Sequence, residues 1–137
     1  MSPIPLVRSF VVCERVLMDT STGMPSLVNI FNRVIALDGF PHTHTCAAFV
    51  SMVGGHGKVS IALKLVDLAR GITYSEYTGE TIFVDPIEPA QMALCLILRF
   101  PGPGLYGLEL EANKVILATH RLVVESPPVT AHSEYST

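Results

Sequence analysis

The chain has 137 residues, which suits one domain with a core of its own and is too short for two. Its net charge is -3, so it lacks the basic surface that nucleic-acid binding requires. No apolar run reaches the ~18 residues of a membrane span, and Glu14 and Arg15 interrupt the best candidate for a signal-peptide core. We therefore expect a cytoplasmic protein without nucleic-acid or membrane partners.

The first predicted strand runs from Val7 to Met18 and is apolar on both faces. Phe10 and Val12 fall on one face, whereas Val11 and Leu17 fall on the other. Such a strand is typical of a central position in a sheet or of a sheet whose outer face is covered. Charged residues make up only 15% of the chain, against roughly 25% in ordinary soluble domains. A surface with so little charge is either neutral and polar or partly covered by another chain.

Further alternating segments follow in order, separated by turns rich in glycine and proline, and none shows a helical period. The expected strands are residues 26–37 with a bulge or bend near Asn32, 45–53, 58–65, 72–77, 81–84 and 91–100. Residues 54–57 (Gly-Gly-His-Gly) are expected to form a hairpin turn between two of these strands.

The stretch from Gly104 to Glu125 predicts a closing hairpin whose turn is Ala112-Asn113-Lys114. Tyr106, Leu108 and Leu110 alternate with residues that include Glu109 and Glu111, which we expect on a solvated face. In the second strand, Ile116, Ala118, His120, Leu122 and Val124 are expected to share one face.

These elements together predict an all-β protein: an antiparallel β-sandwich of about eight strands, immunoglobulin-like in class. A partly closed β-barrel is the alternative. The single domain is expected to cover residues 1–125, and residues 126–137 form a polar and flexible tail.

The sequence contains no catalytic constellation, and we assign no catalytic residue, no cofactor and no cofactor-binding residue. Cys13, Cys46 and Cys95 each lie inside an apolar strand and are expected to be buried free thiols. His42 and His44 would share a face of a strand and are the only weak candidates for a metal site. Asp or Cys partners at ligand spacing are missing, so we assign no metal.

Glu14 stands as a charge within an apolar strand. A buried carboxylate needs a partner, and Arg33 and Arg99 are the candidates. We therefore interpret Glu14, Arg33 and Arg99 as structural polar residues, with the Glu14 pair fixing the register of the sheet.

Three segments carry a family resemblance, which covers roughly residues 6 to 125. The matching positions are Cys13, Glu14 and Val16, then Ser26, Leu27, Val28, Ile30 and Phe31, then Gly104, Tyr106 and Leu108. The sequence resembles a family of small uncharacterised bacterial domains, common in planctomycetes, with a Cys-Glu-x-Val strand and a Gly-x-Tyr closing hairpin. The resemblance implies one globular all-β domain and brings no activity with it.

The leading hypothesis is a non-enzymatic sandwich that acts in protein–protein interaction or as a structural domain. Its partner is another protein or a second copy, bound through the sheet that contains Val7 to Met18. A small-ligand or carbohydrate-binding domain, using residues 54–57 and 86–89, is the alternative, although the chain has no Trp. A metal-dependent hydrolase is the third possibility.

Overall fold

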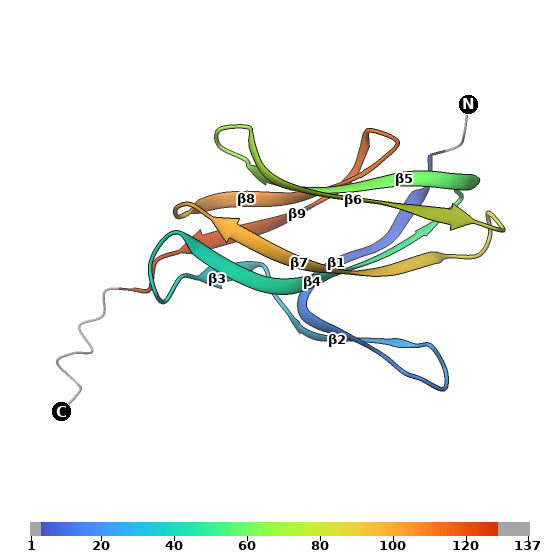
Figure 1. The fold of residues 1–137 in the computed structure, drawn as a ribbon, viewed down its shortest axis with the longest axis horizontal. Coiled ribbons are helices and arrows are strands. Elements are labelled where there is room, and N and C mark those ends of the chain that lie inside the picture. The colour runs from blue at the N-terminus through green and yellow to red at the C-terminus, as the bar shows by residue number, and fades with distance from the viewer. Residues whose placement is uncertain (1–3, 129–137) are drawn as a thin grey trace.

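The computed structural model describes residues 4–128, and these residues form nine strands in two layers (Figure 1). The strands are β1 (Leu6–Met18), β2 (Pro25–Ile30), β3 (Arg33–Ile35), β4 (His42–Val53), β5 (Gly57–Asp67), β6 (Ile72–Phe83), β7 (Ala90–Phe100), β8 (Gly104–Ala112) and β9 (Val115–Glu125). None of the described residues forms a helix long and apolar enough to cross a membrane.

One layer is a four-stranded sheet of order β2-β1-β4-β7, and the other is a five-stranded sheet of order β3-β9-β8-β5-β6. Strand pairs are antiparallel except for β3 and β9, which run parallel. Because the two sheets remain separate, the predicted sandwich is confirmed over a closed barrel. The two-faced apolar pattern of β1 is explained in part by its interior position in the first sheet.

The core fills the space between the two inner faces, as strand alternation requires. The residues of β5 that alternate along one side, Val59, Ile61, Leu63 and Leu65, are all buried in the core. The alternate residues of β7 from Leu96 to Phe100 and of β8 from Tyr106 to Leu110 meet them from the other strands. Tyr106 is anchored as well as buried, because its hydroxyl donates to the carbonyl of Gly102 at 2.7 Å.

The segment expected as one strand over residues 26–37 is instead two strands in different sheets. β2 pairs with β1, whereas β3 pairs with β9. The link is Phe31-Asn32, where the Phe31 N–H donates to Val12 O at 3.1 Å and the Val123 N–H donates to Asn32 O at 2.9 Å. The predicted bend near Asn32 is therefore a crossover that ties one sheet to the other.

The glycine-rich stretch 54–57 is not a hairpin turn, because β4 and β5 belong to different sheets. It carries the chain between the layers, and Gly54 has a φ of 83°, which favours glycine. The Gly54 N–H donates to Pro86 O at 2.9 Å and so ties this link to the loop between β6 and β7. The two short strands expected over 72–77 and 81–84 are one continuous strand, since residues 78–80 also pair with β5.

The closing hairpin is confirmed, with its turn at Asn113 (φ 49°) and Lys114 (φ 70°). Its second strand differs from expectation at Ile116. The register shifts between Leu110, which faces Ala118, and Glu111, which faces Ile116. This bulge turns Ile116 to the outside, where it is 54% exposed, while Leu117 packs against the core.

The two sheets are connected along both of their long sides, but by different means. On one side the chain itself passes from β2 to β3 through Phe31-Asn32. On the other, the Tyr77 hydroxyl of β6 accepts a hydrogen bond from the Ile97 N–H of β7 at 3.2 Å and donates to the Ile97 carbonyl. Tyr77 thereby satisfies backbone groups in the middle of an edge strand, which discourages pairing there with another chain.

Beyond Glu125, residues 126–128 carry no strand. The rest of the predicted tail, residues 129–137, lies outside the described residues.

Candidate interaction surfaces

His42 and His44, the weak metal candidates, lie within β4 and not in a loop before it. Their ring centroids are 5.8 Å apart. The His42 ring stacks on Phe100, and its Nε2 atom is buried without a hydrogen-bond partner among residues 4–128. Across residues 4–128, no three His, Cys, Asp or Glu side chains form a group suited to a metal ion.

Glu14 pairs with His44 and not with Arg33 or Arg99. His44 Nε2 lies 3.1 Å from Glu14 Oε1, at the point where the pairing of β1 with β4 ends. Arg33 instead lies 3.5 Å from Glu125, its neighbour across the β3–β9 pair, and Arg99 is exposed on β7. The Glu14 side chain is 37% exposed, so this pair is half in solvent and not buried as predicted.

Glu14→Gln is expected to lower the free energy of unfolding by no more than about 1 kcal/mol, because a half-exposed ion pair contributes little. Thermal unfolding of the variant should show a small decrease in melting temperature. Arg121→Gln is the matched control, since Arg121 is exposed on β9 and forms no ion pair within residues 4–128. If the melting temperature of Glu14→Gln equals that of the unmodified protein, the Glu14 side chain does not stabilise the sheet.

The thiols divide into two kinds. Cys13 and Cys46 are buried as predicted, whereas Cys95 is exposed because the alternation of β7 turns Leu94 and Leu96 inward instead. Burial raises the pKa of Cys46 to about 12, and burial is also the main cause that raises the pKa of Cys13. Both buried thiols are therefore protonated at neutral pH and are poor nucleophiles.

A two-stranded ribbon, residues 14–30, projects from the sandwich and is called the arm below (Figure 1). It forms because β1 pairs with β4 only from Leu6 to Cys13 and with β2 only from Cys13 to Met18. The turn at its tip is held by Asp19, whose carboxylate accepts hydrogen bonds from the N–H groups of Ser21 and Thr22. These bonds and one from the Ser21 hydroxyl lower the pKa of Asp19 to about 2.

The arm exposes large apolar side chains among polar ones. Leu17, Met18, Met24 and Ile30 are each exposed by about half or more. The prediction that the outer face of β1 is covered is thus correct at Cys13 and wrong at Leu17. Within residues 4–128, the part of β1 beyond Cys13 has no sheet partner on the β4 side, so both edges of the arm present free backbone groups.

The outer face of the four-stranded sheet continues this uncharged character. On β4 and β7 the side chains that alternate with the core residues are Thr45, Ala47, Phe49, Ser51, Gln91, Ala93, Cys95 and Ile97. Ala47, Phe49 and Ser51 are buried, and the others are exposed. Ile97 is 63% exposed. Arg99 lies at one end of this face, and Asp85 and Glu88 lie in the loop at the other end, beside Gly54.

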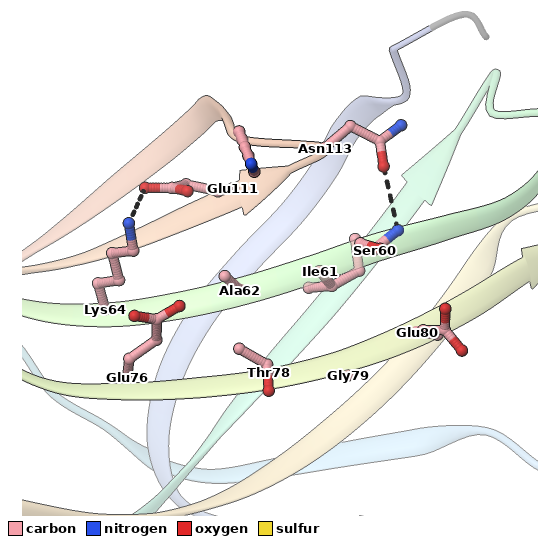
Figure 2. Close-up of a pocket in the computed structure, with 11 residues that line it drawn as sticks. Ser60, Ile61, Ala62, Lys64, Glu76, Thr78, Gly79, Glu80, Glu111 and Asn113 are labelled. Atoms are coloured by element: carbon pink, nitrogen blue, oxygen red, sulfur yellow. Dashed lines mark hydrogen bonds and ion pairs between the residues drawn. The ribbon is translucent and has the colours of Figure 1, made fainter.

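The outer face of the five-stranded sheet differs from the solvated face that the sequence predicted. Glu111 is only 8% exposed, and its carboxylate lies 3.0 Å from Lys64 Nζ. A hollow opens beside this pair (Figure 2), lined by β5, β6, β8 and the β8–β9 turn. The loops 54–57 and 86–89, proposed for ligand binding, do not line it. In the sequence, the hollow is indicated only by two small residues, Ser60 and Ala62, on the outward side of β5 between Lys58 and Lys64.

Comparisons with known proteins place the chain by shape only. No family model matches it, and no curated protein is significantly similar in sequence. It is similar to the crystal structure of an immunoglobulin-like protein from Pseudomonas aeruginosa, with 13% identity, a TM-score of 0.40 and coverage of 89% of this chain and 97% of that one. The CARDB domain of a Pyrococcus furiosus protein, solved in complex with di-metal ions, has 13% identity and a TM-score of 0.42, covering 91% of this chain and 99% of that one.

Proposed function

We propose that the chain is a non-enzymatic β-sandwich module that binds protein, and that it binds a second copy of itself through the four-stranded sheet and the arm. The observation that carries this proposal is the arm, which exposes apolar side chains and free strand edges together. The free thiols and the resemblance to planctomycete-type domains support a place for the module in the bacterial cytoplasm.

The arm has a physical reason to seek a partner. A two-stranded ribbon is marginally stable in water unless a third strand or an apolar surface packs against it. Leu17 and Met18 point to opposite faces of the ribbon, so neither face is fully polar. A strand or sheet from another molecule would bury both the side chains and the free backbone groups.

A second copy suits the outer face of the four-stranded sheet, whose central exposed residues on β4 and β7 are Thr45, Gln91, Ala93, Cys95 and Ile97. Its centre is uncharged, so two such faces can meet without desolvating a charge. Arg99 lies at one end of the face, and Asp85, Glu88 and the exposed Arg8 lie near the other. An antiparallel two-fold pair would place Arg99 of each copy near the two carboxylates of its partner.

Sedimentation equilibrium from low to high micromolar concentration tests the proposal. The unmodified chain is expected to form dimers, and Leu17→Asp combined with Met18→Asp is expected to be monomeric because a charge then lies on each face of the arm. Ile116→Asp adds a charge at an exposed apolar residue of the other sheet and should leave the dimer intact. A chain that stays monomeric at high micromolar concentration, or an arm variant that still dimerises, would contradict self-association.

A further inference from the structure

The hollow on the five-stranded sheet is a second surface, on the layer opposite the arm, and does not depend on self-association. We propose that it binds an extended segment of another polypeptide that carries two basic residues four positions apart. The hollow encloses about 820 Å³ and is open to solvent along the sheet.

The shape of the hollow follows from side-chain size. Its floor is formed by Ser60 and Ala62 of β5 and Thr78 of β6, which are small and point outward (Figure 2). The β8–β9 turn forms one wall. Asn113 holds this turn against β5, because its N–H donates to Ser60 O at 2.9 Å and its Oδ1 accepts from the Ser60 N–H at 3.2 Å. The wall is therefore fixed in place.

The hollow is lined by three carboxylates, of Glu76, Glu80 and Glu111, and by two ammonium groups, of Lys64 and Lys114. Register places Glu76 opposite Lys64, Glu80 opposite Ser60, and Glu111 opposite Ala62. Lys64 is already engaged by Glu111 at 3.0 Å, and the hydrogen bond that its ammonium donates to this carboxylate is the main cause that raises the pKa of Lys64. Glu76 and Glu80 are exposed and form no ion pair within residues 4–128, so their charge is available to a partner.

The positions of the carboxylates indicate which chemical class of partner the hollow would bind. They come from two strands and do not converge on one point, which disfavours a bound ion. The lining includes no aromatic ring on which a sugar could stack. Glu76 and Glu80 lie on one side of β6, about 13 Å apart for four residues of strand. An extended peptide with lysines at positions i and i+4 presents two cations at the same spacing.

The test uses fluorescein-labelled seven-residue peptides of glycine and serine that contain two lysines. In one peptide the lysines are four positions apart, and in the other they are adjacent. Fluorescence anisotropy at low salt should show that the spaced peptide binds more tightly than the adjacent one. Binding should weaken as salt is raised, because the charges are exposed.

Glu76→Gln combined with Glu80→Gln is expected to weaken the spaced peptide on the order of tenfold. Asp38→Asn combined with Glu125→Gln removes the same charge from positions outside the hollow and should change affinity little. Ala62→Phe places a large ring on the floor of the hollow and should abolish binding of the spaced peptide. Circular dichroism checks that this variant remains folded.

Each opposite result overturns the proposal. Equal affinity for the two peptides, or equal loss in the two double variants, would show attraction to net charge without a site. If the spaced peptide does not bind, the hollow is not a peptide site. None of these results bears on the dimer, because the arm and this sheet face are on different layers.

Discussion

Gly55→Ala is expected to destabilise the protein by about 3 kcal/mol, as overpacking of a buried position does. A Cβ atom at Gly55 would overlap the ring of Phe83, approaching its Cγ atom to 2.8 Å. The ring is 4% exposed and has no free space to enter. Relief would require movement of the link that carries the chain from β4 to β5, and so a change in how the two sheets are joined. Urea denaturation followed by circular dichroism measures the loss.

Gly79→Ala is the matched control for this prediction. Gly79 lies in the exposed edge strand β6, and a Cβ atom there would meet no atom within 4 Å. Alanine also reduces the freedom of the unfolded chain, so stability should be unchanged or slightly higher. If the two variants lose equal stability, the close approach of Gly55 to Phe83 is not what constrains the link.

The sequence predicts the strands of this fold better than the connections between them. Alternation identifies the inward side of β5 and of β7 because each has one buried and one exposed face. It says nothing about which sheet the next strand joins. The glycines at 54–57 suit a tight hairpin and a link between layers equally, since both need positive φ angles. Asn32 gave a signal of a bend, but only the hydrogen bonds of Phe31 and Asn32 show that the bend changes sheets.

The candidate surfaces depend on features that alternation cannot show. The partner predicted for Glu14 was wrong because the sequence does not show sheet membership, and β3 carries Arg33 into the other sheet. Leu17 was expected to be covered because its strand is apolar on both faces, and the departure of β1 from β4 left it exposed. Glu111 was expected in solvent because its strand alternates regularly, but the neighbouring Lys64 comes from a strand that is distant in sequence.

Phe100→Ala is expected to cost about 3–5 kcal/mol, the range for removal of a buried aromatic side chain. Phe100 is fully buried, and its ring contacts Tyr106 edge-to-face with the centroids 4.9 Å apart. It also stacks on His42, so its removal leaves a cavity beside an imidazole nitrogen that already lacks a hydrogen bond. The surroundings are the paired strands β4 and β7, whose backbone cannot collapse into the space without breaking the ladder.

Ile97→Ala on the same strand is the comparison, because its side chain points away from the core and is 63% exposed. Its loss should stay within about 0.5 kcal/mol at concentrations where the chain is monomeric. Phe100→Leu should recover part of the stability, since it refills part of the cavity without restoring the ring contact with Tyr106. If Phe100→Ala unfolds at the same urea concentration as Ile97→Ala, the end of the sandwich near His42 does not belong to the cooperative core, and the inward assignment of β7 would then hold only up to Leu98.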